Sequence, residues 1–446
     1  MQDIGRREMI GAGAGALAAL GLAGCDPGGN GGSGNGGTDA RPGKEPGPVR
    51  SSPTGRPAKP IGDGSTSYTG KQPHQPPAPV PLEPGQTPPQ FVVFSWDGAG
   101  EVGNGLFPRF LDLAREHDAH MTFFLSGIYL LPESKKRLYR PPNNPVGASD
   151  IGYLKDENIR ATLTCVDRAW REGHEIGTHF NGHFCGGSGS VAHWTSAQWR
   201  SEIEQAESFV GKWRTHTGWT DLPPLPFDYQ KELVGARTPC LLGRDRLLPA
   251  ARERGWRYDS SSPGGTQRWP GKRGGLWDLP LQAIPFPGRS FEVLSMDYNI
   301  MVNQSGNSTQ GPTRHRARWR EQATDALLAG FRRAYESNRA PLFIGNHFEQ
   351  WNGGIYMDAV ENALRRIADT AGGPGKSGRS SKSGRSGASG KTHDNDIRIV
   401  SFRQLVDWLD VQRPEVLDRL RALDVGRAPV GGWRAYLGKS AATPTT

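Results

Sequence analysis

The chain has 446 residues, enough for one large domain or two of ordinary size. Its formal net charge is +9, but one Gly/Ser-rich stretch supplies five positive charges: Lys376, Arg379, Lys382, Arg385 and Lys391. The basic balance therefore indicates a solvated loop. Because no stripe of basic residues interleaved with aromatic residues is present, we expect no nucleic-acid partner.

The N-terminal residues have the order of an export signal. Arg6 and Arg7 precede a short run of Ala, Gly and Leu that ends at Cys25. The run is too short to span a bilayer as a stable helix, so it predicts a signal peptide over residues 1–25. The small residues before Cys25 resemble the lipobox of bacterial lipoproteins, and the arginine pair resembles a twin-arginine signal. We expect lipidation of Cys25 and anchoring at the outer face of the cytoplasmic membrane; the alternative is an unstructured N-terminus with an incidental cysteine.

Residues 26–90 consist of Gly, Pro, Ser and charged residues with almost no large apolar side chains. Such a segment cannot bury enough surface to offset its ordering entropy, so we predict a disordered tether. The folded domain is predicted to span residues 91–425, with a disordered basic insertion at 372–392. Residues 426–446 are predicted to form a C-terminal tail.

Within the domain, apolar runs suited to buried strands alternate with amphipathic helical patterns. The predicted strands are 91–96, 121–126, 174–178, 234–237, 256–258, 293–296, 342–345 and 397–401. The predicted helices are 107–116, 158–171, 196–215, 244–254, 318–335, 356–369 and 402–409. This alternation predicts an α/β fold with a parallel sheet that is long enough to close into a distorted (β/α) barrel. Ligands bind such a barrel at the C-terminal ends of its strands.

The strongest local signal is the pair His179 and His183. The two residues are four apart after a predicted strand, so one helical turn would place both imidazoles on the same side. This spacing suits two ligands of one divalent cation, typically Zn²⁺. The alternative is a surface turn with two hydrogen-bonded histidines. His174 precedes the turn and is expected to bond locally.

Three further polar residues fall at predicted strand ends. Asp97 follows the first strand, where a carboxylate serves as a general base, a metal ligand or an ordinary helix cap. Arg237 can hold a carboxylate in its ionised form, or it forms a structural salt bridge. His347 follows the strand at 342–345 and can protonate a leaving group.

Three cysteines follow Cys25: Cys165, Cys185 and Cys240. An odd number in an exported protein leaves either one thiol free or all three reduced. Cys185 and Cys240 each lie beside one of the motifs above, so a disulfide between them is one of the two alternatives.

In their order, these motifs resemble the polysaccharide deacetylase family (NodB-type, carbohydrate esterase family 4), and within it the chitin-deacetylase-like branch. The resemblance runs from Phe91 to about Asp410 and includes the flanking segments 89–92, 258–261, 275–280 and 338–341. It implies a metal-dependent hydrolase that removes N-acetyl groups from an envelope or extracellular N-acetylglucosamine polymer such as peptidoglycan.

The resemblance also implies a role for each motif residue. His179 and His183 become ligands of a divalent metal, Zn²⁺ by preference, and Asp97 becomes the base. Arg237 orients Asp97, and His347 is the acid. Backbone N–H groups near residues 237–239 are expected to help stabilise the oxyanion, together with the metal.

Trp277 and Trp351 are candidates for contact with the sugar, and Trp96 is a further candidate for stacking. The alternative for each is packing in the core, the commoner fate of a tryptophan in such positions. Asp259 or Asp297 is the expected partner of His347.

The chain departs from the family pattern at two positions. Phe180 stands where Ser or Thr is usual, and Gly98 stands where the family has an Asp as its third metal ligand. The metal is then held by the two histidines with Asp97 and water, or with another carboxylate such as Asp259 or Asp297. An alternative alignment makes Asp97 the metal ligand and leaves Trp96 in the place of the base.

Three functions remain open, and the change at Gly98 is the support for the second of them. The first is the deacetylase, the second a catalytically impaired glycan-binding lipoprotein on the same scaffold, and the third a metal-dependent amidase or esterase acting on another substrate.

Overall fold

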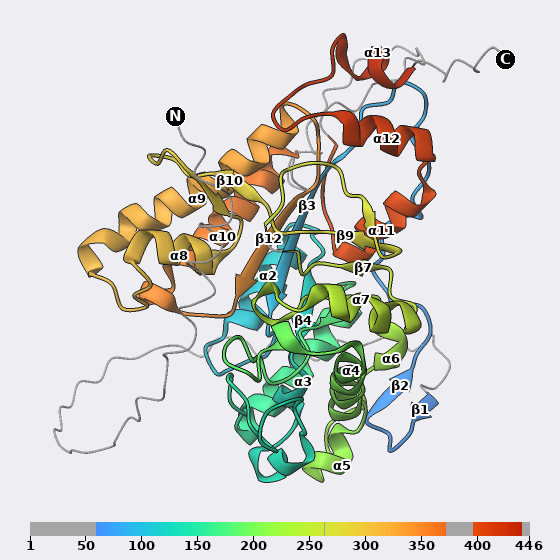
Figure 1. The fold of residues 1–446 in the computed structure, drawn as a ribbon, viewed down its shortest axis with the longest axis vertical. Coiled ribbons are helices and arrows are strands. Elements are labelled where there is room, and N and C mark those ends of the chain that lie inside the picture. Colours follow the sequence, from blue (N-terminus) through green and yellow to red (C-terminus); the bar gives the residue numbers. More distant parts are fainter. Residues whose placement is uncertain (1–58, 263, 372–395, 439–446) are drawn as a thin grey trace, which may run out of the picture.

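A buried parallel sheet forms the centre of the protein (Figure 1). The computed structural model describes residues 59–262, 264–371 and 396–438. Strand β3 (Gln90–Asp97) is buried along its whole length, as expected of an apolar run covered on both faces. It pairs in parallel with β12 (Leu342–His347), β4 (Thr122–Leu125) and β13 (Ile397–Ile399).

From β4 the sheet continues in parallel through β5 (Glu175–Thr178), β6 (Gly235–Ala236), β7 (Tyr258–Asp259) and β9 (Leu276–Asp278), and ends at the antiparallel β8 (Lys272–Arg273). Single backbone hydrogen bonds link the two ends of this sheet and close it into a barrel. The Gly345 N–H in β12 donates to the Ser295 carbonyl at 2.9 Å, and the Ser295 N–H donates to the Gln282 carbonyl, just beyond β9, at 2.8 Å. This curled sheet with loose closure confirms the predicted distorted (β/α) barrel.

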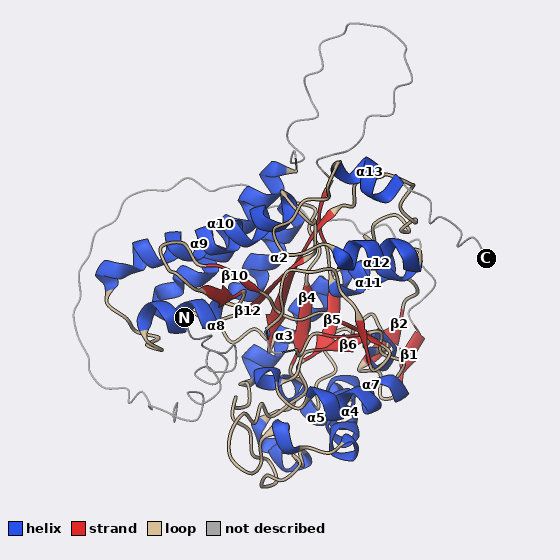
Figure 2. Cartoon of the chain, turned by 45° about the horizontal axis from the view of Figure 1, so that its top comes forward, coloured by secondary structure: helices blue, strands red, loops and turns tan. Residues whose placement is uncertain are grey.

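Helices cover the outside of the sheet (Figure 2). The longer ones are α2 (Leu106–Glu116), α3 (Asp156–Arg171), α4 (Ser196–Gly211), α7 (Arg244–Glu253), α8 (Asp297–Ser305), α9 (Thr313–Tyr335), α10 (Trp351–Thr370), α11 (Phe402–Val411) and α12 (Pro414–Ala422). The shorter ones are α5 (Trp213–Thr217), α6 (Tyr229–Glu232), α13 (Gly432–Gly438), and the 3-10 turns η2 (Gly127–Leu130), η3 (Glu133–Leu138), η4 (Val191–His193) and η5 (Pro239–Leu241). Helices α9 and α10 pack along each other on one side of the sheet.

Each predicted strand and helix overlaps an element of the structure. Two of them differ from the prediction, one in its continuity and the other in its pairing. The predicted helix at 196–215 is broken at Lys212, whose φ of −131° separates α4 from α5. The predicted strand at 293–296 overlaps β11 (Glu292–Leu294), which forms an antiparallel hairpin with β10 (Ala283–Pro285) and not a ladder of the main sheet.

The prediction of a disordered tether up to residue 90 is wrong for residues 59–89. Strands β1 (Lys59–Ile61) and β2 (Thr66–Tyr68) form an antiparallel hairpin. The Trp213 indole N–H donates to the Ser65 carbonyl at 2.6 Å, and the Ser67 N–H donates to the Leu225 carbonyl at 2.8 Å. Leu82 is only 5% exposed and joins the core beside α11. Hydropathy missed this segment because backbone hydrogen bonds, and not apolar runs, hold most of it.

The C-terminal tail predicted at 426–446 is also partly wrong. Residues 432–438 form α13, in which Leu437 is buried and the Tyr436 hydroxyl donates to the Arg419 carbonyl at 2.7 Å. The predicted signal peptide, the insertion at 372–392 and residues 439–446 lie outside the described residues.

Removing residues 1–89 is expected to destabilise the domain. Full burial of a leucine side chain such as Leu82 contributes about 1.5–3 kcal/mol, and the hydrogen bonds of the hairpin are lost as well. We expect the urea midpoint of a chain that begins at Gln90 to fall, while a chain that begins at Lys59 keeps the midpoint of the full protein. Equal midpoints for the two shortened chains would contradict this account of the segment.

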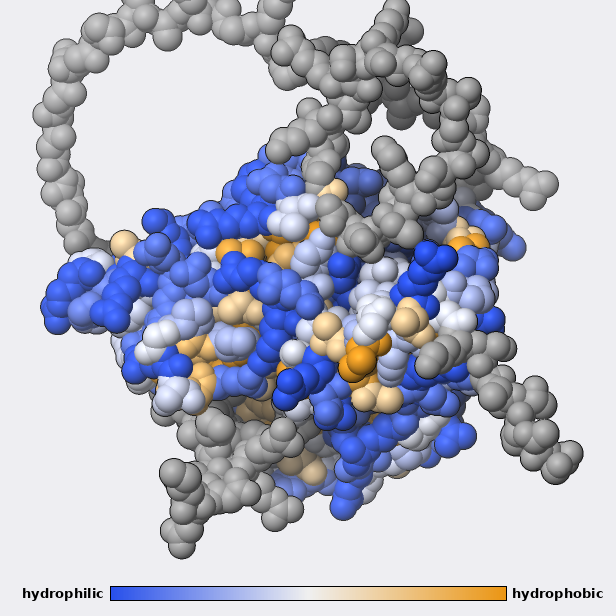
Figure 3. All heavy atoms as spheres, turned by 90° about the horizontal axis from the view of Figure 1, so that it is seen from above, coloured by the Kyte–Doolittle hydropathy of each residue, from blue (hydrophilic) through white to orange (hydrophobic). Residues whose placement is uncertain are grey.

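The face of the molecule seen in Figure 3 is largely hydrophilic, with apolar residues in small separate groups. No helix in the described ranges combines the length and apolar character needed to cross a membrane.

Candidate active site

Asp97 and His347 lie opposite each other at the C-terminal ends of neighbouring strands. The parallel register of β3 and β12 pairs His347 directly with Asp97. Neighbouring strands are about 4.8 Å apart, so the sheet itself fixes a carboxylate beside an imidazole. Asp97 is 5% exposed, whereas the side chain of His347 is 25% exposed. Solvent therefore reaches the imidazole more readily than the carboxylate.

Arg237 follows β6 and is completely buried against Asp97. Its Nη1 donates to Asp97 Oδ1 at 2.8 Å and to Ser95 Oγ at 2.9 Å. Its Nε and Nη2 donate to the carbonyl and hydroxyl oxygens of Ser260, and the guanidinium lies 4.9 Å from the centroid of the Phe124 ring. These contacts leave the guanidinium one orientation, so the position of the carboxylate is fixed as well.

The ion pair decides the charge of Asp97. Burial alone would raise the pKa of this carboxyl group, but the Arg237 guanidinium, first among its charged neighbours, holds the pKa below its ordinary value. Asp97 is therefore ionised at neutral pH and can accept a proton.

The loop after β6 does not offer the oxyanion donors expected at residues 237–239. The Arg237 N–H already donates to the Thr178 carbonyl at 3.3 Å, and the Thr238 N–H donates to Ser261 Oγ at 2.9 Å. Pro239 has no N–H to donate. At these three residues the loop uses its backbone donors to hold itself in place, and none is left for an oxyanion.

His179 and His183 lie in a loop after β5 and not in the helical turn that their spacing predicts. Phe180 and His183 adopt left-handed backbone angles, with φ of 63° and 59°. Phe180 is completely buried, with its ring 4.7 Å from that of Trp199, which accounts for an apolar residue at this position. The two imidazoles are nevertheless close neighbours, with centroids 5.1 Å apart.

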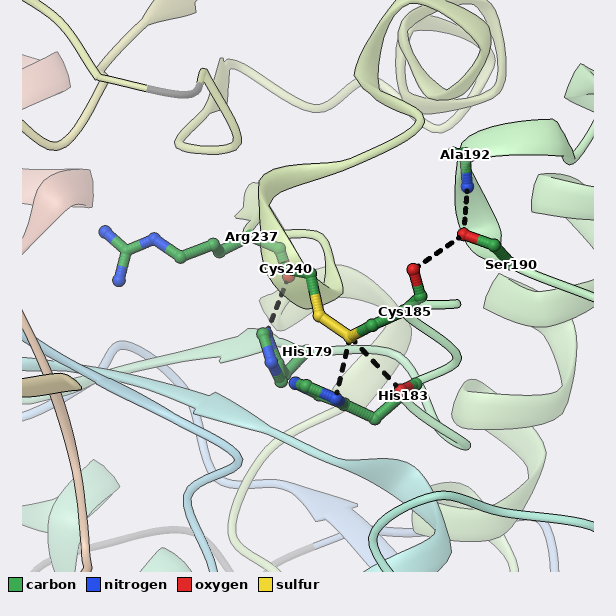
Figure 4. The surroundings of a disulfide bond; sticks show 7 residues. All are labelled: His179, His183, Cys185, Ser190, Ala192, Arg237 and Cys240. Carbon is green, nitrogen blue, oxygen red and sulfur yellow. Dashed lines mark hydrogen bonds between the residues drawn. A yellow bond between two sulfur atoms is a disulfide. The ribbon is translucent and has the colours of Figure 1, made fainter. Parts of the chain in front are cut away.

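One nitrogen of each imidazole contacts a nearby residue of the same protein (Figure 4). Nδ1 of His179 lies 2.8 Å from the Arg237 carbonyl oxygen, and because that oxygen only accepts, we assign the proton to Nδ1. Nδ1 of His183 lies 3.4 Å from Cys185 Sγ. Burial lowers the pKa of His179 to about 4 and that of His183 to about 3, so both rings are neutral at pH 7. Neither Nε2 atom forms a hydrogen bond within the described part of the chain.

A disulfide between Cys185 and Cys240 joins the loop after β5 to the loop after β6, with the Cα atoms 5.9 Å apart. The structure thus shows the bridged alternative, with Cys165 as a buried free thiol. Ligand atoms of His183, Cys185 and Cys240 lie within 4.8 Å of one another, a spacing compatible with a metal ion. The two sulfurs are bonded to each other, however, and only thiolates serve as strong metal ligands.

Asp297, the first residue of α8, is the partner of His347. Its Oδ1 lies 2.8 Å from Nδ1 of His347, and its Oδ2 accepts the His347 backbone N–H at 2.7 Å. Burial opposes a charge on the imidazole, but the Asp297 carboxylate outweighs it and raises the pKa of His347 to about 9. His347 is therefore protonated at neutral pH. Asp259, the other candidate partner, instead accepts a hydrogen bond from Ser261 Oγ at 2.6 Å.

The predicted sugar contacts have different surroundings in the structure. The ring of Trp351 is partly exposed and lies 5.4 Å from that of His347, and the Tyr298 ring lies 5.8 Å from Trp351. Trp277 is 3% exposed in the core, and its indole N–H donates to the Asp410 carboxylate at 2.8 Å. The assignment of Trp277 as a sugar contact is therefore wrong, since a buried ring cannot stack on a ligand. Trp96 is completely buried as well.

Sequence reasoning missed three residues that shape the site: Ser95, Ser260 and Tyr298. Side chains two residues apart in a strand point to the same side, so Ser95 lies on the side of Asp97 and could have been predicted from the sequence. Ser260 and Tyr298 belong to no spacing that points to the site. Cys25, the predicted site of lipidation, lies outside the described residues.

No model of a known protein family matches the chain, and no curated protein matches its sequence. Among solved structures, a polysaccharide deacetylase from Mycobacterium smegmatis is 15% identical, over 74% of this chain and 93% of that chain, with a TM-score of 0.38. A peptidoglycan N-acetylglucosamine deacetylase is 14% identical, over 66% of this chain and 86% of its own, with a TM-score of 0.31. A pseudoenzyme of carbohydrate esterase family 4 from Bacillus anthracis is 10% identical, over 78% of this chain and 73% of its own, with a TM-score of 0.33. At these TM-scores the likeness assigns neither a family nor a function.

Proposed function

We propose that the protein is a metal-dependent hydrolase that removes N-acetyl groups from an N-acetylglucosamine polysaccharide of the cell envelope or its surroundings. One observation carries the proposal: an ionised carboxylate, Asp97, and a protonated imidazole, His347, are paired across adjacent strand ends, and both groups influence the pKa values of the neutral His179 and His183. Amide hydrolysis needs a proton acceptor for water and a proton donor for the leaving amine. Two groups whose surroundings push their pKa values apart can divide these roles.

The pair His179 and His183 fits a divalent cation. Both rings are neutral, both have an Nε2 atom without a hydrogen-bond partner in the described residues, and the other nitrogen of each ring is supported, as metal-binding histidines generally require. Nitrogen ligands of this kind suit Zn²⁺. When bound, the ion would polarise the acetamide carbonyl and lower the pKa of water.

The other residues of the site supply the proton transfers. Asp97, oriented by Arg237, accepts a proton from the attacking water. His347, kept protonated by Asp297, donates a proton to the departing nitrogen. The partly exposed ring of Trp351 next to His347 offers a surface for the sugar ring. The products are acetate and a free amine on the polymer.

Acetate release from N-acetylglucosamine oligomers, with and without added Zn²⁺ or Co²⁺, tests the proposal. We expect release that depends on the metal and that falls more than about 100-fold in His179→Ala, because even the loss of a group that supports a ligand costs 10–100-fold. The matched control is His193→Ala, which removes an exposed imidazole from η4. A metal-free protein that cannot be reconstituted, or full activity in His179→Ala, would contradict the proposed metal site.

Gly98 favours one alternative, a glycan-binding protein without catalysis. In the described ranges, the one cluster of three potential metal-ligating side chains includes the two disulfide-bonded cysteines, so no third free protein ligand joins the histidine pair. Oligosaccharide binding in a calorimeter together with no acetate release at any metal concentration would support this alternative. Faster cleavage of small acetamides or acetate esters than of oligomers would instead indicate an amidase or esterase.

We also propose that a lipid on Cys25 anchors the mature protein at the outer face of the membrane. The proposal rests on the sequence order of arginine pair, apolar run and cysteine. We expect the mature N-terminal peptide to begin at Cys25 with the mass of an added diacylglyceryl group. Cys25→Ser should move the protein from the membrane fraction to the soluble fraction. An unmodified peptide that continues through the apolar run would contradict the anchor.

A further inference from the structure

The absence of a side chain at Gly98 opens a small polar space beside Asp97. Gly98 has a left-handed φ of +62°, and a Cβ built on it would lie 3.7 Å from the Tyr129 hydroxyl oxygen and 3.8 Å from Ser126 Oγ. These are ordinary contact distances, so no atom occupies the position itself. Two hydroxyl groups from the segment after β4 thus border the place where residue 98 would carry a side chain.

Neither hydroxyl has a partner in the described part of the protein. Ser126 is completely buried, and its Oγ forms no hydrogen bond. Ser126 precedes η2 as its N-cap, where a serine hydroxyl ordinarily accepts a backbone N–H, yet this bond is not made. Tyr129 is 9% exposed and its hydroxyl forms no hydrogen bond there either, but of the two oxygens only Ser126 Oγ is both fully buried and unpaired. Buried polar groups are rarely left unpaired, and an orphaned one points to a bound water or ion.

The space lies next to Asp97 and to the start of the histidine loop. Gly98 directly follows Asp97. The residue before Ser126, Leu125, accepts the backbone N–H of His179 at 2.9 Å, so Ser126 flanks the start of the histidine loop. The ring of Tyr129 is held against Gly100, where an added Cβ would come within 2.5 Å of it.

The Tyr129 hydroxyl is a permanent donor. Its burial, together with the negative carboxylate of Glu349, raises the pKa of Tyr129 above its ordinary value. Glu349 lies two residues beyond His347 in the sequence. A neutral hydroxyl with one proton to donate and lone pairs to accept suits a water molecule, and it offers no negative charge to a cation.

We propose that Ser126 and Tyr129 are positioning residues that hold a water molecule in the space beside Gly98, and that this water serves as the neutral oxygen ligand where a carboxylate side chain is missing. The inference rests on the proposed metal-dependent function. It predicts a cation site with one negative charge fewer than a site of two histidines and a carboxylate, and therefore a lower affinity for the cation. Two changes then have opposite effects: removing a hydroxyl weakens cation binding, and placing a carboxylate at position 98 strengthens it.

The test measures Zn²⁺ affinity of the full chain by competition with a chromophoric chelator. We expect Tyr129→Phe and Ser126→Ala each to bind Zn²⁺ about 10-fold more weakly or worse, in the range seen when a supporting hydrogen bond is lost. Tyr153→Phe is the control, because its hydroxyl is already bonded to the Gly147 carbonyl at 3.2 Å. Thermal unfolding in the presence of chelator checks that each variant is folded. If Ser126→Ala does not fold, the Zn²⁺ affinity of Tyr129→Phe decides the test.

Two substitutions at residue 98 complete the test. Asp and Asn both tolerate left-handed backbone angles, so Gly98→Asp and Gly98→Asn carry similar strain but differ in charge. We expect Gly98→Asp to raise the Zn²⁺ affinity at least about 10-fold and to make it insensitive to Tyr129→Phe, while Gly98→Asn gives no such gain.

The outcomes separate this inference from the proposed function. Wild-type affinity in both hydroxyl variants overturns the inference and leaves the histidine pair intact. Zn²⁺ binding by Gly98→Asp but not by the wild type also overturns it, because the hydroxyls then fail to complete the site. No Zn²⁺ binding by any of these proteins overturns the metal centre, and the inference with it.

Discussion

Asp97→Asn is expected to lower the free energy of unfolding by about 3–5 kcal/mol and to abolish hydrolysis. The Arg237 guanidinium is completely buried and has Asp97 as its only ion-pair partner among the described residues. Removing the carboxylate charge leaves a buried cation without compensation, which is among the costliest single changes in a protein interior. The loss of activity has a separate cause, since an amide does not act as a base.

A double-mutant cycle of Asp97→Asn with Arg237→Met measures the interaction energy between the two charges apart from their contacts with other residues. Methionine keeps an apolar stem against Phe124 but removes the charge. Arg237→Met alone should also be strongly destabilising, because it leaves a buried carboxylate unpaired. The double variant should be milder than the sum of the two, since replacing a whole buried pair is often nearly neutral.

Urea unfolding of the four proteins gives the coupling energy. The control is Arg200→Met, which breaks an exposed pair with Glu253 and is expected to leave the urea midpoint almost unchanged, because exposed ion pairs add little stability. Additive effects of Asp97→Asn and Arg237→Met would show that the two charges do not depend on each other.

The strand ends were predictable from the sequence because apolar runs are a local signal. The run before Asp97 and the run before His347 each read as a buried strand, and parallel strands bring their C-terminal ends to one edge. The pairing of His347 with Asp97 follows from that rule together with the register.

The choice between Asp259 and Asp297 was not predictable in the same way. Both aspartates occur near the end of a predicted strand, and only the closure of the barrel distinguishes them. The backbone bond from Gly345 to Ser295 brings the start of α8 beside the end of β12, and this places Asp297 against His347. Such a closure depends on two segments far apart in the sequence. It produces no hydrophobic periodicity in either segment, so the sequence pattern does not predict it. The error with Trp277 has the same origin, because hydropathy does not tell a buried tryptophan from one at a cleft.

Asp297→Asn is expected to remove the stabilisation that the protein gains from protonated His347. The pKa of His347 is about 9 in the folded protein, above the ordinary value of about 6.5. A raised pKa contributes stability that is complete below pH 6.5 and is lost as the pH rises through 9, with a total of about 3 kcal/mol. The difference in unfolding free energy between the wild type and Asp297→Asn should therefore be largest near pH 6 and smallest near pH 10. Urea titrations of the metal-free proteins across this range measure it.

The same substitution should move the alkaline limb of the pH–rate profile for acetate release. In the wild type the proton donor persists to about pH 9, so kcat should fall only above that pH. Without the Asp297 carboxylate, His347 returns to an ordinary pKa of about 6.5 or lower, and at pH 8 about 3% of it or less is protonated. Activity of Asp297→Asn should then recover as the pH is lowered toward 6, which a merely structural defect would not do. Asp259→Asn serves as the control, since Asp259 bonds to Ser261 and should leave the position of the limb unchanged. Superimposable profiles for Asp297→Asn and the wild type would mean that His347 is not the group whose proton the reaction consumes.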